Sequence, residues 1–187
     1  FFFLFLALRY TFPSISLEGR ASWALFSSST GVRQFYYTKY FFHAFVLLVF
    51  GVTIAGTLNL ILDIDPRLHY LCIFIMVLLS FGLASCTLGL GAIFHNFEAR
   101  TAADVNSDTG ALVAMIVTLL YFAISMYLSA RFALNFYLGK SVFEQFSLQE
   151  IQNPTLYLEL AAFFAIQYIV ITLPISLGLR KLDECEF

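Results

Sequence analysis

Residues 41–62 form a run that contains no acidic or basic side chain except His43. Three further, largely apolar runs resemble it, at about residues 68–94, 109–130 and 157–179. A helix of about 20 apolar residues, rising about 1.5 Å per residue, crosses the roughly 30 Å hydrocarbon core of a bilayer. We therefore predict an integral membrane protein with four complete transmembrane helices.

The composition favours the same class of protein. Hydrophobic residues make up 60% of the chain and charged residues only 12%, whereas about 25% of the residues of a soluble domain are charged. A soluble protein of this composition would lack the polar side chains needed to cover its surface. The formal net charge is only −2, which gives no field to attract nucleic acid. The expected surrounding is the lipid bilayer, and nucleic acid is not an expected partner.

The predicted fold class is all-α. We expect a polytopic transmembrane helical bundle that forms a single domain over residues 1–187, with four complete spans and the end of a truncated one. Residues 1–8 are apolar but too short to span a bilayer. They also lack the basic region and cleavage site of a signal peptide. We interpret them as the last turns of a transmembrane helix, and the chain as the C-terminal part of a longer protein.

Two connecting segments, a cytoplasmic loop at 9–40 and an outer loop at 131–155, carry patterns typical of short amphipathic helices. In the first, apolar residues recur at helical spacing from Leu17 to Leu25. This pattern predicts a surface helix, which is either a docking surface for a soluble partner or a passive interfacial helix. In the second, the sequences S-V-F-E and S-L-Q-E fit capping boxes. They predict one or two interfacial helices, or an ordered loop packed on the helix ends.

The basic residues predict the orientation of the bundle. If the 9–40 loop is cytoplasmic, seven of the ten basic residues lie inside and three lie outside. The positive-inside rule favours this arrangement, and parity then places the C-terminus in the cytoplasm. The residues expected inside are Arg9, Arg20, Arg33, Lys39, Arg100, Arg180 and Lys181.

The spans themselves carry no catalytic pattern. Their middles hold no acidic or basic residue, so we do not expect a proton-coupled pump. No H-E-x-x-H, no G-x-S-x-G and no P-loop G-x-x-x-x-G-K-[ST] occurs in these 187 residues. We expect no catalytic residue, no metal site and no cofactor in this chain, and we do not expect it to be an enzyme by itself.

Residues inside the spans do predict how the helices pack. Small residues four apart, such as Ser85 and Gly89, favour close helix approach, and hydroxyl or amide groups such as that of Gln167 can hydrogen-bond between helices. Pro174 lies within the last span, where we expect it to bend the helix near its cytoplasmic end.

Two stretches are more specific. The first is F-P-S-I-S-L-E-G-R-A-S-W at residues 12–23, followed by a serine-rich turn, and the second is G-L-G-A-I-F-H-N-F-E-A at residues 89–99. Together they resemble segments in the C-terminal half of the membrane subunit of a bacterial ABC exporter, of the ABC-2 permease type. The likeness covers essentially the whole chain in order and spacing, although the specific motifs occupy only two loops.

This resemblance implies a set of partners and a location. Such a permease lies in the bacterial cytoplasmic (inner) membrane and pairs with a second permease half, or with a second copy of itself. A separate ABC ATPase subunit binds ATP and Mg and docks on its cytoplasmic helices. The implied docking residues are Ser16, Leu17, Glu18, Gly19 and Arg20. The implied inner-loop motif, a second docking candidate, comprises Gly89, Gly91, Phe94, Phe97 and Glu98.

The expected function is therefore that of a permease subunit that moves an unidentified substrate across the cytoplasmic membrane, while a separate subunit hydrolyses ATP. A non-transport polytopic scaffold, or an assembly subunit of a membrane complex, is the alternative. An intramembrane enzyme is a third class, but it needs paired catalytic groups at one depth, which the sequence lacks. An ATPase partner whose activity changes in the presence of this chain would distinguish transport from scaffolding.

Overall fold

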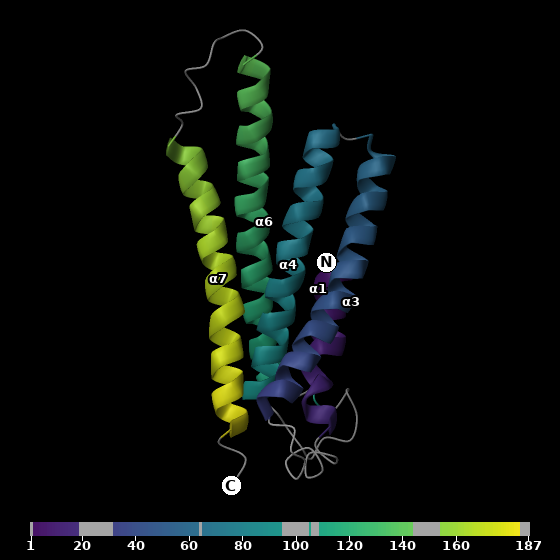
Figure 1. Cartoon of the computed structure of the whole chain (residues 1–187), viewed down its shortest axis with the longest axis vertical. Helices are drawn as coiled ribbons and strands as arrows, with labels where there is room; N and C mark the ends of the chain where they lie inside the picture. The colour runs from purple at the N-terminus through teal and green to yellow at the C-terminus, as the bar shows by residue number, and fades with distance from the viewer. Residues whose placement is uncertain are drawn as a thin grey trace.

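The computed structural model describes residues 2–18, 32–63, 65–94, 105, 109–143 and 154–183. Every regular element in this part of the chain is helical (Figure 1). In chain order these are α1 (Phe2–Leu6), the π-helical turn η1 (Ala7–Thr11), the 3-10 turns η2 (Phe12–Ser14) and η3 (Ser16–Glu18), α3 (Val32–Ile61), α4 (Pro66–Ile93), α6 (Thr109–Phe143) and α7 (Pro154–Asp183). The predicted all-α bundle is confirmed.

Four helices of the described chain are long and apolar enough to cross a membrane. The apolar stretches are Arg33–Ile61, Leu68–Ile93, Thr109–Leu134 and Leu158–Leu182. Each of them contains most or all of one run predicted from the sequence. The four-span prediction is thus confirmed, and the helices extend beyond the predicted spans.

The largest difference from the prediction lies in α6. This helix has 35 residues and continues to Phe143, so the first half of the expected outer loop at 131–155 is helical. No proline follows Thr109 until Pro154, so nothing in the sequence forces the helix to end at the membrane surface. The second S-x-x-E sequence of that loop lies outside the described residues, as does most of the surface helix expected from Leu17 to Leu25.

Two helices start at a proline. Pro66 is the first residue of α4 and Pro154 the first of α7, a position where the missing N–H of proline costs no hydrogen bond. The amide of His69 donates to the carbonyl of Asp65 at 3.0 Å, as expected for a helix that starts there. Asp63 takes a positive φ of 51° in the turn between α3 and α4, so these helices form a tight antiparallel hairpin.

The helix α4 is the centre of the bundle. It packs against α3, α6 and α7 and also against η1 and η2, and Figure 1 shows it between α3 and α6. Half of its apolar stretch is buried inside the protein, compared with 11% for α7. Large apolar side chains on α6 and α7 face outward, which suits helices in contact with lipid.

The two ends of the bundle are distinct. The turn that joins α3 to α4 lies at one end, here called the turn end. The last residues of η3, α4 and α7 and the first residues of α3 and α6 lie at the opposite end (Figure 1). We call this the motif end, because both sequence motifs reach it. The residues from Phe2 to Glu18, here called the N-terminal segment, run toward the motif end beside α3 and α4.

Candidate functional site at the motif end

The two sequence motifs meet at Gly91 and Phe12. A Cβ atom placed on Gly91 would overlap the carbonyl oxygen of Phe12 and lie 3.2 Å from its carbonyl carbon. Backbone therefore contacts backbone here, as only glycine allows. The Phe12 ring is 2% exposed and packs with Val105 and Ala114. Phe12 thus joins the N-terminal segment to both α4 and the start of α6.

Lys39 fixes the next turn of the N-terminal segment. Its ammonium group, carried by α3, donates a hydrogen bond to the carbonyl oxygen of Ser14. The Ser14 hydroxyl in turn donates to the carbonyl of Thr11 at 2.7 Å. The lysine also lies over the Phe35 ring, 5.1 Å from its centroid. The sequence identified Lys39 only as a basic residue expected on the inside, and did not predict this contact.

A second glycine, Gly89, makes an equally close contact with α7. A Cβ atom on Gly89 would lie 2.6 Å from the carbonyl oxygen of Pro174. Gly178, one turn further along α7, faces Ala92 and the Cα atom of Gly89. Residues two apart on a helix point about 200° away from each other. Gly89 and Gly91 therefore bring different elements against opposite sides of α4.

Ser85 adds a hydrogen bond to the contact between α4 and α7. Its hydroxyl lies 3.1 Å from the carbonyl oxygen of Val170 and 2.8 Å from that of Ile171. Val170 is four residues before Pro174, which has no N–H to donate to it. A carbonyl left without a donor inside a membrane is costly, and the Ser85 hydroxyl supplies a donor that Val170 shares with Ile171. The helix α7 accordingly continues through Pro174 to Asp183.

Phe94 ends α4 against the start of α6. Its amide donates to the carbonyl of Leu90 at 2.9 Å. A Cβ atom on Gly110 would lie 2.6 Å from the Cβ atom of Phe94. The Phe94 side chain is 37% exposed. This residue of the second motif is therefore held by its backbone while part of its ring remains accessible.

The docking residues implied by the resemblance do not share one environment. Ser16 is 1% exposed, whereas Leu17 beside it is 45% exposed. The turn η3 thus buries Ser16 and leaves Leu17 accessible. Glu18 ends η3, but its side chain is outside the described part. The remaining motif residues outside the described chain are Gly19, Arg20, Phe97 and Glu98.

A polar pair lies deeper in the bundle, between α6 and α7. The Tyr121 hydroxyl donates to Oε1 of Gln167 at 2.7 Å, and both residues are buried. A Cβ atom on Gly82 of α4 would lie 2.8 Å from the same Gln167 oxygen. Three helices therefore meet around one hydrogen bond. Gln167 was expected to bond between helices, but the sequence did not identify Tyr121 as its partner.

The site contains contacts rather than a set of reactive groups. No three His, Cys, Asp or Glu side chains gather as metal ligands within the part of the chain that the structure describes. What the motif end does contain is a series of backbone contacts that joins the N-terminal segment to α4, and α4 to α7. A displacement of the N-terminal segment would therefore shift α4, and with it the α7 backbone at Pro174.

Comparison with protein families decides which group of proteins this arrangement belongs to. A family model described as "Putative ATP-binding cassette" matches residues 2–187. The chain belongs to this ATP-binding cassette family. The match includes both motifs, so the resemblance seen in the sequence is confirmed at the level of the ABC transporter family. Comparisons with curated proteins and with solved structures find no match.

Proposed function

We propose that this chain is the membrane-spanning permease subunit of an ABC exporter, and that a separate ATPase subunit binds and hydrolyses ATP. The observation that carries the proposal is the match of nearly the whole chain to an ABC family. The same residues form four apolar helices and contain no P-loop. A family member with spans and without a nucleotide-binding motif fits the permease role.

The motif end is the cytoplasmic end in this proposal. Basic residues gather there, including Arg33 and Lys39 at the start of α3 and Arg180 and Lys181 at the end of α7, as the positive-inside rule favours. The ATPase docks on the segment from Leu17 to Arg20, together with the loop that follows Phe94. Among the described side chains of the implied docking set, Leu17 is the exposed apolar one, and it forms the anchor of this contact.

Coupling runs through the two glycine contacts. When the ATPase binds ATP, it favours one position of the docking segment over another, and this differential affinity drives the change. Phe12 passes the displacement to α4 at Gly91, and Gly89 passes it to α7 at Pro174. No titratable group in the spans is needed for this mechanism. The transported substrate moves along helix faces that these displacements rearrange.

Purification from the native membrane tests the proposal. The full-length protein is tagged, extracted in mild detergent, and examined for a P-loop ATPase that comes with it in stoichiometric amount. Recovery of such a subunit, with ATP hydrolysis that changes when the permease is removed, supports transport. Recovery of the intact, folded protein without any ATPase would reject it and favour a polytopic scaffold.

A further inference from the structure

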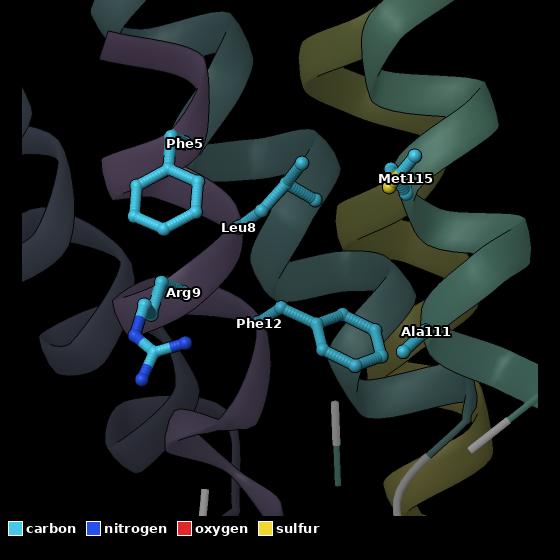
Figure 2. A pocket seen from close by; sticks show the side chains of 6 residues that line it. All are labelled: Phe5, Leu8, Arg9, Phe12, Ala111 and Met115. Atoms are coloured by element: carbon cyan, nitrogen blue, oxygen red, sulfur yellow. The ribbon is translucent and has the colours of Figure 1, made fainter. Parts of the chain in front are cut away.

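A cavity of about 190 Å³ opens between the N-terminal segment and α6. Figure 2 shows its walls: Phe5, Leu8, Arg9 and Phe12 come from the N-terminal segment, and Ala111 and Met115 from α6. All of these residues except Arg9 are apolar. A cavity of about 150 Å³ with an apolar lining stays dry and takes up an apolar molecule in other proteins. This cavity has the size and chemistry to hold part of a hydrocarbon chain.

Arg9 gives the cavity a charged rim. In Figure 2 its guanidinium lies on the same side of the Phe5 ring as Phe12 and Ala111, toward the motif end. The guanidinium carbon is 6.0 Å from the centroid of the Phe5 ring. The side chain is exposed, and no carboxylate of the described residues lies within ion-pairing distance of it. A ligand from outside the protein can thus reach this exposed guanidinium.

The cavity lies close to the motif end of the apolar stretch of α6. The apolar stretch of α6 begins at Thr109, and Met115 is six residues later, or about 9 Å along the helix axis. At this depth an arginine extends to the headgroup region while its methylene groups stay in the apolar layer. An apolar cavity beside such an arginine matches the two halves of a phospholipid.

We propose that this cavity binds an anionic phospholipid of the bilayer, with an acyl chain against Leu8 and Met115 and the phosphate on Arg9. Charge complementarity selects an anionic headgroup over a zwitterionic one, because the arginine charge has no carboxylate partner among the described residues. The site is independent of the transport function proposed above. It would hold the N-terminal segment against α6 in the membrane, next to the contact between Phe12 and Gly91.

A second cavity, on the other side of the N-terminal segment, can be compared with the cavity that contains Arg9. It measures about 380 Å³ and is lined by residues of α1, η1 and α3, including Tyr10 and His43. It is larger and also mostly apolar, but neither arginine nor lysine is among its lining residues. Lipid chains can enter it without any preference for charge. The headgroup preference is thus specific to the cavity that contains Arg9.

Quenching of a single tryptophan by brominated lipids tests the proposal. The full-length protein is prepared with Phe5→Trp as the source of its single tryptophan. This probe lies in the cavity wall, and the side chain at position 5 changes little in size. The protein is reconstituted with brominated phosphatidylglycerol or brominated phosphatidylcholine. We expect phosphatidylglycerol to bind about fivefold more tightly, the gain of one basic group near an anionic lipid. Arg9→Gln should abolish the preference and Arg9→Lys should keep it.

Two controls define the outcome. Phe45→Trp places the probe on an exposed face of α3 that lines neither cavity, and it should show no preference. Arg180→Gln removes an exposed basic residue elsewhere at the motif end, and should leave the preference at position 5 intact. Equal quenching by the two lipids at position 5, or a preference that survives Arg9→Gln, would overturn the proposal.

A measurement on the unaltered protein covers the case in which a variant does not fold. Purified full-length protein is heated in detergent with added phosphatidylglycerol or phosphatidylcholine. Binding to the folded state alone raises the unfolding temperature, so phosphatidylglycerol should raise it more. Equal shifts would count against the site.

Discussion

The Ser85 hydroxyl on α4 lies 3.1 Å from the carbonyl oxygen of Val170 on α7, the same carbonyl that Pro174 leaves without a helical donor. One helix thus compensates for a defect in its neighbour. The contact is reinforced by Gly89, against which the Pro174 backbone packs. The contribution of Ser85 to stability therefore depends on Pro174, and this dependence can be measured.

A double-mutant cycle on Ser85 and Pro174 tests that dependence. Ser85→Ala should lower the free energy of unfolding by about 1 kcal/mol, the usual size of an interhelical hydrogen bond in a membrane. Pro174→Ala restores an N–H for Val170, so Ser85→Ala should then cost less, and only the hydrogen bond to Ile171 should still be lost. Equilibrium unfolding in mixed micelles, followed by circular dichroism, gives the four values. Additive effects would show that the hydroxyl and the proline act independently.

The glycine contacts predict a difference among three alanine substitutions. Gly89→Ala and Gly91→Ala should each destabilise the protein by about 1–3 kcal/mol, because the added methyl group meets backbone atoms that must move. Gly56→Ala is the matched control, since nothing lies within 4 Å of a Cβ atom there. It should leave the stability unchanged or improve it. The same unfolding assay ranks the three, and equal costs would contradict the packing.

The hydrogen bond between Tyr121 and Gln167 predicts a rescue. Tyr121→Phe leaves the Gln167 oxygen without its donor, at a cost of about 1–3 kcal/mol. The Nε2 atom of Gln167 is already buried without a hydrogen-bond partner. Adding Gln167→Leu to Tyr121→Phe should therefore recover most of the stability, because both unpaired groups disappear. A double variant less stable than Tyr121→Phe alone would refute this account of the polar pair.

The proposed docking surface predicts that Leu17 matters to the partner rather than to the fold. Leu17→Asp should reduce recovery of the ATPase by about tenfold, the effect of losing one anchor worth about 1.4 kcal/mol. Leu62→Asp makes the same change on an exposed leucine at the turn end, and should leave recovery unchanged. Co-purification with quantitative blotting measures both. Equal losses from the two variants would argue against docking at the motif end.

The proposed orientation predicts which cysteines react from outside the cell. In protein without Cys72 and Cys86, Cys185 should react with a membrane-impermeant maleimide only after the cells are opened. A cysteine introduced by Asp63→Cys at the turn end, with Cys185 also removed, should react in intact cells, since Asp63 is exposed. Gel-shift labelling reads both positions. The reverse pattern would place the motif end outside and remove the basis for ATPase docking there.

Much of the fold could be predicted because apolar run length and proline position are local signals. The run at residues 41–62 and the prolines at the starts of α4 and α7 identify spans and helix starts without knowledge of the neighbours. The continuation of α6 to Phe143 was not predicted. Loss of apolar character at Arg131 marks the edge of the bilayer, but a helix ends only where a breaker or a cap stops it.

The contacts of the site could not be predicted in the same way. Each span is apolar on all sides, so its sequence carries no periodic signal for the side that faces the bundle. The spacing of Ser85 and Gly89 predicted a close approach but not that α7 would be the partner. Ser16 was expected on a docking surface and is buried, because neighbouring residues in a 3-10 turn point in different directions.

The opposite positions of Gly89 and Gly91 limit how α4 can move. A rotation of this helix about its own axis would carry Gly91 away from the Phe12 carbonyl and turn a neighbouring side chain toward it. The same rotation would separate Gly89 from Pro174. Only tilting or sliding preserves both contacts, and then the N-terminal segment and α7 must follow. The bundle therefore has fewer independent motions at the motif end than its number of helices suggests.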